Sequence, residues 1–301
     1  MGTMPRLAAL WSVLVLAACA APAPAARRPV AAATIPPLAD LVSKVAGPRW
    51  DVRTVVPAGT SPHVFEPTPR EVRLVAPARL VVTVGAGYDA WAGRLAAACA
   101  SQARLFDAGR SAGIEAGEGG EGVAGHAHGD LGHDPHWWLS PPLAAKILPQ
   151  LSDELSALDP DGASGYRDRA EALAAALERL DAEVAETLRP VSGSSIVTAH
   201  AAWGYFAERY GLKPAAAIEP APGREPSPRE IRELVLVARR EKLRTLFTEP
   251  QFPEEAARVV AEEAGLRLAT VDPIGGVPGR AGYEELLRFN ARAFRDGLGV
   301  R

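Results

Sequence analysis

Three histidines that lie far apart in the chain stand in similar sequence surroundings. His63 lies in TSPHVFEPTP, His136 in DPHWWLSPP and His200 in IVTAHAAWGYF, so each has a proline, an aromatic residue or the end of a β-like run beside it. Neutral imidazole is the commonest side-chain metal ligand near pH 7. The three histidines therefore predict a protein that handles a metal ion.

The other histidines of the chain, His126, His128 and His133, lie together in residues 109–135, a segment rich in glycine and glutamate. The segment has almost no apolar periodicity, which predicts a loop. Two interpretations stay open for it. Either the three imidazoles and the neighbouring carboxylates form a weak outer site that collects metal ions, or the segment is an acidic loop without that role.

Segments typical of strands alternate with segments typical of helices, which predicts α/β units with parallel sheets. Capping boxes at Thr68–Glu71 and Ser227–Glu230 mark two helix starts, and Asp89 is expected to cap a third helix. The expected strands are residues 30–35, 51–56, 79–85, 194–199, 244–248 and 267–271.

The longest periodic segment runs from residue 164 to residue 189, with apolar residues at spacings of three and four. This stripe predicts a helix of roughly 40 Å, at 1.5 Å per residue. We expect a linking helix at 161–190 between an N-terminal lobe at 29–160 and a C-terminal lobe at 191–301. The alternative is a surface helix of a single domain. The stripe consists of Tyr166, Ala170, Leu173, Leu177, Leu180, Val184 and Leu188.

Several candidate ligands follow directly after expected strands. His63 and His200 come after the second and fourth of these strands, and Glu249 and Asp272 come after the fifth and sixth. Open parallel sheets bind their ligands beyond the carboxyl ends of the strands, so two facing lobes would enclose a metal site in the cleft between them. Three imidazoles and the Asp272 carboxylate would suit Zn²⁺, whereas Mn²⁺ prefers more oxygen donors. Glu249 is expected to support a ligand or a helix cap.

The N-terminal residues 1–19 have the features of an export signal, with Arg6 before an apolar run too short to span a bilayer. The run ends in Leu-Ala-Ala-Cys, a pattern like a bacterial lipobox, at which Cys19 is lipidated; residues 20–29 would then be a Pro/Ala tether. The alternative is ordinary cleavage in APAPAA with loss of Cys19. Either way we expect an exported protein, in the periplasm or on the outer face of the cytoplasmic membrane. Only Cys99 then remains, so no internal disulfide is expected.

The overall composition sets wider limits. A chain of 301 residues, 48% of them hydrophobic, can form one large or two medium domains with real cores. The formal net charge is −3 and no basic stripe stands out, so nucleic acid is not an expected partner.

Five motifs in order make the chain resemble the metal-binding solute-binding proteins of bacterial ABC importers (cluster A-I), and within them the high-affinity zinc-uptake type. The motifs are SPHVFEPTP, DPHWWLSP, TAHAAWGYFAERYGL, FTEPQF and VDPIGG, and the similarity covers essentially the whole mature chain. The resemblance implies two α/β lobes joined by a long rigid helix, with Zn²⁺ between them as transported ligand. It implies His63, His136 and His200 as ligands, with Asp272, a glutamate near the first histidine, or water in the fourth position.

The resemblance also implies a monomeric receptor, without enzymatic activity, whose partners are an ABC permease and its ATPase. Manganese-selective members tend to carry a carboxylate where this chain has His200, which favours zinc. The remaining alternatives are a receptor for manganese or another divalent metal, a metal-dependent surface adhesin, and a zinc hydrolase. The sequence contains no HExxH, which counts against the hydrolase.

Overall fold

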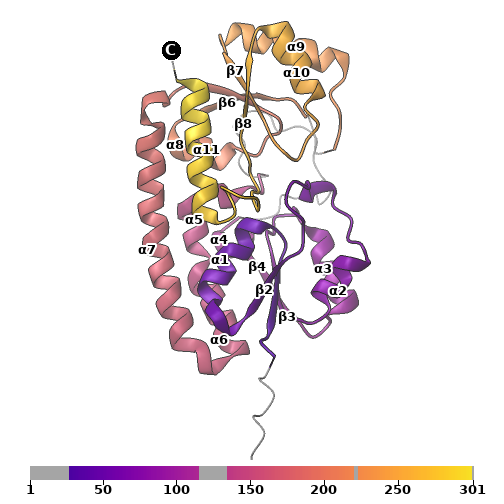
Figure 1. The fold of residues 1–301 in the computed structure, drawn as a ribbon, viewed down its shortest axis with the longest axis vertical. Coiled ribbons are helices and arrows are strands. Elements are labelled where there is room, and N and C mark those ends of the chain that lie inside the picture. Colours follow the sequence, from indigo (N-terminus) through magenta and orange to yellow (C-terminus); the bar gives the residue numbers. More distant parts are fainter. Residues whose placement is uncertain (1–26, 115–133, 220–222, 300–301) are drawn as a thin grey trace, which may run out of the picture.

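The computed structural model describes residues 27–114, 134–219 and 223–299, and places one four-stranded parallel sheet in each half of the chain (Figure 1). The expected signal, Cys19 and nearly all of the tether lie outside the described residues. So do His126, His128 and His133. In the described residues, no helix combines the length and the apolar character that a bilayer crossing requires.

The sheet of the N-terminal lobe has the strand order β2-β1-β3-β4. Helices follow the strands along the chain, and the capping box at Thr68 is formed as expected. β4 was not expected, and the prediction that the histidine-containing loop begins at residue 109 is wrong, because a short helix covers its first residues. The elements are β1 (Val30–Ala33), α1 (Pro36–Ala46), β2 (Asp51–Thr54), α2 (Pro69–Val75), β3 (Ala78–Thr83), α3 (Ala90–Cys99), β4 (Arg104–Asp107), α4 (Ala108–Ala112), α5 (Pro141–Lys146) and α6 (Leu148–Leu158).

The C-terminal lobe repeats this arrangement with the strand order β6-β5-β7-β8. The capping box at Ser227 is also formed, and β6 is a second strand that the sequence pattern did not predict. The elements are β5 (Ser195–Thr198), α8 (Gly204–Tyr210), β6 (Lys213–Ala217), α9 (Pro228–Arg240), β7 (Thr245–Thr248), α10 (Glu255–Ala264), β8 (Arg267–Thr270) and α11 (Tyr283–Leu298).

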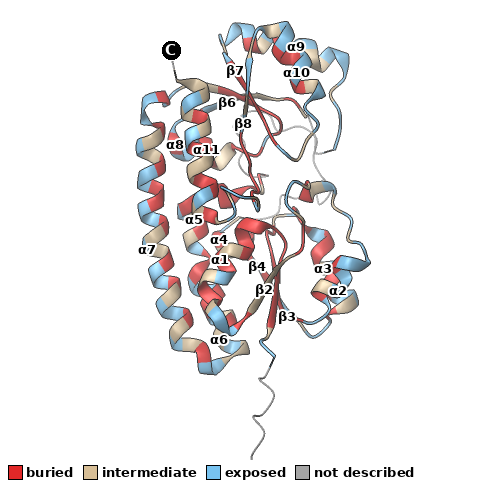
Figure 2. Ribbon diagram, viewed as in Figure 1, coloured by how far each residue is buried: buried red, intermediate tan, exposed pale blue. Residues whose placement is uncertain are grey.

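Helix α7 (Ala163–Leu188) runs along one side of the molecule and contacts both lobes (Figure 1). It packs on α1, α5 and α6 of the N-terminal lobe and on α11 of the C-terminal lobe. All seven residues of the predicted apolar stripe are buried, on the face turned toward the lobes (Figure 2). One continuous core therefore extends from Leu41 through Leu173 to Phe294. The prediction of two α/β lobes joined by a long helix is confirmed.

Asp89 has a different role from the predicted one. Its side chain makes no cap bond to α3. It accepts hydrogen bonds from Thr34 Oγ1 (2.5 Å) and from the backbone N–H groups of Val84 (2.6 Å) and Gly85 (3.1 Å). Burial raises the pKa of Asp89 to about 6, although these three donors act to lower it. Asp89 thus binds the end of β3 to the end of β1 instead of starting a helix.

Candidate metal centre

The three candidate histidines come from three separate segments that meet between the lobes. His63 lies in a single 3-10 turn (Pro62–Val64) after β2, and His136 directly precedes another, Trp137–Leu139. His200 lies two residues beyond the end of β5. The first and third of these positions are at carboxyl ends of strands, where parallel sheets leave space for a ligand.

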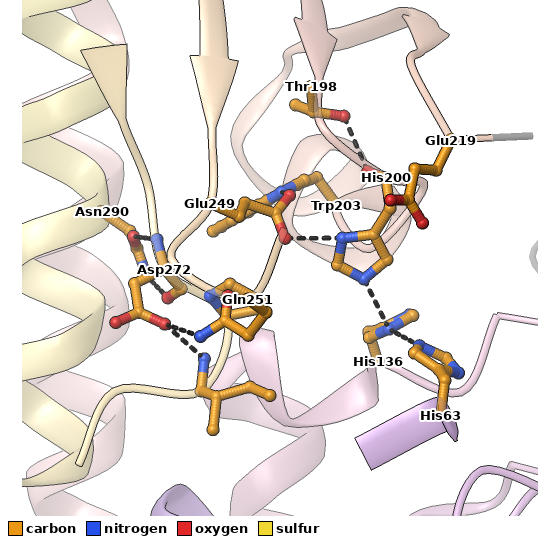
Figure 3. A network of polar contacts seen from close by, with 12 residues as sticks. His63, His136, Thr198, His200, Trp203, Glu219, Glu249, Gln251, Asp272 and Asn290 are labelled. Carbon is orange, nitrogen blue, oxygen red and sulfur yellow. Dashed lines mark hydrogen bonds and ion pairs between the residues drawn. The ribbon is translucent and has the colours of Figure 1, made fainter. Parts of the chain in front are cut away.

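The ring nitrogens of these histidines converge on one point (Figure 3). His136 Nε2 lies 3.1 Å from His63 Nε2 and 3.3 Å from His200 Nε2. One ligand atom of each histidine lies within 4.8 Å of the others. Among the described residues, no other three histidine, cysteine, aspartate or glutamate side chains come together in this way. Two nitrogens bound to a tetrahedral zinc ion at 2.0–2.1 Å would be roughly 3.3 Å apart. The separations of His136 from His63 and from His200 therefore match those of zinc ligands, and the third pair lies within 4.8 Å.

Two carboxylates fix the outer nitrogens of the buried histidines. Asp134 Oδ1 lies 2.7 Å from His136 Nδ1 and also accepts the backbone N–H of His136 at 2.9 Å. Glu249 Oε2 lies 2.5 Å from His200 Nδ1, and its Oε1 accepts a hydrogen bond from Trp203 Nε1 at 3.0 Å. A carboxylate at Nδ1 holds the proton there, which leaves the Nε2 lone pair free to bind a metal and makes it more basic. The sequence analysis did not include Asp134; a carboxylate two residues before His136 was the signal available.

Aromatic rings surround the histidines and limit the access of water. The ring of Tyr88 lies edge-on to His63 at 4.4 Å between centroids, and Phe252 lies 4.8 Å from His200. Burial raises the pKa of Tyr88 well above its usual range, so its phenol stays neutral and offers no anionic ligand. His136 and His200 are buried, whereas His63 is partly exposed. Solvent therefore reaches the group mainly at His63.

Asp272, the expected fourth ligand, has its carboxylate engaged elsewhere. Oδ1 accepts hydrogen bonds from Gln251 Nε2 (2.9 Å) and from the N–H groups of Ile274 (3.0 Å) and Gly275 (2.9 Å). Oδ2 lies 2.6 Å from Arg280 Nε in a part-buried ion pair. Asp272 lies outside the group formed by the three histidines. In this arrangement the carboxylate organises the turn after β8 and does not face the metal position.

The lobes are also bonded to each other close to the histidines. Trp138 Nε1 donates to the carbonyl oxygen of Pro273 at 2.8 Å, and Tyr283 Oη donates to the carbonyl oxygen of Trp138 at 2.6 Å. Both bonds are buried and join the segment that carries His136 to the C-terminal lobe. They hold the two halves of the site at a fixed separation.

The chain matches a known protein family and known proteins over most of its length. Residues 32–297 match the family model described as zinc-uptake complex component A, periplasmic. The zinc-binding lipoprotein AdcA of Streptococcus pneumoniae is 31% identical over 247 residues, which cover 80% of this chain and 49% of AdcA. The high-affinity zinc uptake system protein ZnuA of Bacillus subtilis is 27% identical over 283 residues, covering 89% of this chain and 87% of ZnuA. The chain thus spans about half the length of AdcA.

A solved structure shows the same fold. A crystal structure of ZnuA superposes with a TM-score of 0.76 at 28% identity, and the superposition covers 91% of this chain and 100% of that one. The two parallel sheets and the long helix therefore belong to an architecture that is already known.

Proposed function

Since this chain belongs to the family of periplasmic zinc-uptake component A proteins, we propose that it is an extracytoplasmic receptor that captures Zn²⁺ and delivers it to an ABC-type permease and its ATPase for import. The similarity to the zinc-binding lipoprotein AdcA and to the zinc uptake system protein ZnuA supports zinc as the bound metal. Export, a lipid anchor at Cys19 and a monomeric state belong to the same proposal.

The observation that carries the proposal is the convergence of three Nε2 atoms from both lobes, two of them from rings fixed by a carboxylate. A nitrogen-rich site of this kind suits zinc, since Mn²⁺ and Mg²⁺ prefer oxygen donors. We therefore assign His63, His136 and His200 as the ligands of the transported ion. Glu249 and Asp134 orient the rings, and Asp272 is left out of the ligand set because Arg280 and three N–H donors occupy its carboxylate.

A receptor fits this site better than a zinc hydrolase does. A hydrolytic zinc site needs an open metal position together with a carboxylate that can take a proton from bound water. Here Asp134 and Glu249 are both bonded to histidine Nδ1 atoms, on the side of each ring away from the metal position. Such carboxylates strengthen metal binding and are badly placed to act as a base.

The long helix suggests how the receptor holds its ion. Because one core runs through α7 into both lobes, and buried bonds join the lobes beside the site, we expect only small lobe movements on binding. Ligand protons must leave when zinc binds, so binding weakens as the pH falls through the range in which imidazole is protonated.

Calorimetric titration of the metal-stripped chain from Ala20 onward, with Zn²⁺ and with Mn²⁺ at pH 7, tests the proposal. We expect tight binding of one zinc ion, much weaker binding of manganese, and loss of tight zinc binding in His63→Ala. A preference for manganese would contradict the choice of metal. Growth of cells lacking the gene under zinc limitation separates the transport function from the adhesin alternative, which predicts normal growth.

A further inference from the structure

The fourth donor to the metal can be sought among the acidic residues around the histidines. Three of them already have buried partners. Asp134 is bonded to His136, Glu249 to His200 and Trp203, and Asp272 to Arg280 and three N–H groups. None of these can turn toward the metal position without giving up those partners.

Glu219 is placed differently. Strand β6 pairs with β5 in parallel, with Thr198 opposite Ala217. The pairing continues past both strands, since Ile218 N donates to Thr198 O at 3.0 Å and Glu219 N donates to Ala199 O at 2.8 Å. By this register Glu219 lies opposite His200, and paired residues of neighbouring parallel strands point to the same face.

The side chains agree with the register. Figure 3 shows the carboxylate of Glu219 beside the imidazole of His200. The register and the positions of the side chains thus agree that Glu219 lies next to His200.

The carboxylate of Glu219 is held by one exposed hydrogen bond. It is only half-buried, and it accepts a hydrogen bond from the backbone N–H of Gly223 at 3.1 Å, on the exposed side of the loop. It lines a cavity of about 240 Å³ in the C-terminal lobe, to which Glu249 and Phe252 also contribute. Turning Glu219 inward would exchange one exposed hydrogen bond for contact with a divalent cation.

We propose that Glu219 is the fourth ligand of the bound metal ion, reached by rotation of its side chain toward His200. In the structure its carboxylate lies outside the group of three histidines, so the rotation accompanies binding. Three neutral imidazoles bring no negative charge to a divalent ion, and a carboxylate beside them partly neutralises it. The assignment rests on the proposed function, because it concerns the same metal position.

The test uses the metal-stripped chain from Ala20 and its Glu219→Gln variant, with two probes. Competition with a fluorescent chelator measures the affinity for Zn²⁺, and the visible absorption of bound Co²⁺ reports its ligands. We expect Glu219→Gln to weaken zinc binding at least about tenfold, since even outer carboxylates contribute that much, and to change the Co²⁺ spectrum. Glu225→Gln is the matched control, since Glu225 lines the same cavity but is not paired with His200; it should change neither.

Three results would overturn the assignment or separate it from the function. Unchanged affinity and spectrum in Glu219→Gln would mean that water is the fourth donor. Weaker binding with an unchanged Co²⁺ spectrum would mean that Glu219 acts through its charge and is not a ligand. Failure of the unmodified chain to bind zinc would refute the proposed function itself. Glu219→Ala, with its fold checked by circular dichroism, must repeat the result of Glu219→Gln.

Discussion

The two lobes contribute to the metal centre in different ways. In the proposed site the N-terminal lobe supplies two imidazoles from outside its sheet, His63 within a 3-10 turn and His136 directly before one. The C-terminal lobe supplies one imidazole, His200, and most of the nearby carboxylates, which follow its strands directly. Nitrogen donors thus come mainly from one lobe and negative charge mainly from the other. A divalent cation is bound tightly where nitrogen donors and negative charge lie together. The proposed site therefore depends on the fixed position of the two lobes.

The two lobes also bury one aspartate each near the carboxyl end of their sheet, and stabilise it differently. Asp272 is 1% exposed and pairs with Arg280. Asp89 is 2% exposed, and the partners of its carboxylate are a hydroxyl and two backbone amides. Burial raises the pKa of Asp89 to about 6. Protein donors therefore satisfy both buried carboxylates in this structure, with a cation among them at Asp272 and none at Asp89.

The largest expected effect is on stability, in Asp272→Ala. Removing Asp272 leaves the part-buried Arg280 without its counter-charge and the buried N–H groups of Ile274 and Gly275 without an acceptor. Each buried group left unsatisfied lowers the free energy of unfolding by about 1–3 kcal/mol. Urea unfolding of the metal-free protein measures this. Asp51→Ala is the control, because Asp51 and Arg53 form a partly exposed pair that should contribute no more than about 1 kcal/mol. A stable Asp272→Ala variant with weakened zinc binding would return Asp272 to the ligand set.

His200→Ala should have the opposite profile, with zinc affinity lost and the fold kept. Zinc binding at structural sites amounts to about 10–16 kcal/mol, so one of four ligands accounts for roughly 2.5–4 kcal/mol, a loss of about a hundredfold or more in affinity. Competition with a chelator measures the affinity, and thermal unfolding of the metal-free form checks the fold. Affinity within a few-fold of the unmodified chain would exclude His200 as a ligand.

Asp89→Asn should change how stability depends on pH. The folded-state pKa is raised from 3.8 to about 6, so the folded protein holds this proton more tightly than the unfolded chain does. The stabilisation of the folded state by this proton is complete below about pH 4 and is lost as the pH rises through 6. It amounts to about 3 kcal/mol. Between pH 4 and pH 7 the free energy of unfolding of the unmodified chain should therefore fall by about 3 kcal/mol relative to that of the variant. Parallel stability profiles in urea would contradict the raised pKa.

The smallest of these effects is expected from the carboxylates behind the histidines. Glu249→Gln and Asp134→Asn keep the shape of each side chain and remove its charge, and such changes usually weaken metal binding by about 10–100-fold. Similar losses of zinc affinity in the two variants would mean that Asp134 of the N-terminal lobe and Glu249 of the C-terminal lobe contribute equally to metal binding. Glu186→Gln, at an exposed pair with Arg189, is the control and should bind zinc normally. An unchanged affinity in both test variants would remove the orienting role.

The sequence predicted the central elements of the fold because those elements are apolar and clearly bounded. β1, β3, β5 and β7 occupy the middle of the two sheets. Of the edge strands, β2 and β8 were predicted, whereas β4 and β6 were missed, since RLFD and KPAAA are short and carry charged, proline or alanine residues. An edge strand is defined by the neighbour it pairs with, and that neighbour is distant in the sequence.

The same limit explains the result for the site. The three histidines could be predicted because each lies in a distinctive local motif, and they do converge. Asp272 follows a strand as a ligand would, but its partner Arg280 lies across a turn, and nothing local indicates that they pair. No local sequence motif marks Glu219 as a candidate ligand. Its position beside His200 follows only from the pairing of β5 with β6.

X-ray absorption at the zinc edge, measured on the zinc-loaded protein, identifies the atoms bound to the metal. We predict three nitrogen donors at about 2.0–2.1 Å with the outer scattering of imidazole, and one oxygen donor. His200→Ala should lose one imidazole from this signal. Fewer than three imidazoles in the unmodified protein, or a shell made mainly of oxygen, would contradict a zinc site built by His63, His136 and His200 between the lobes.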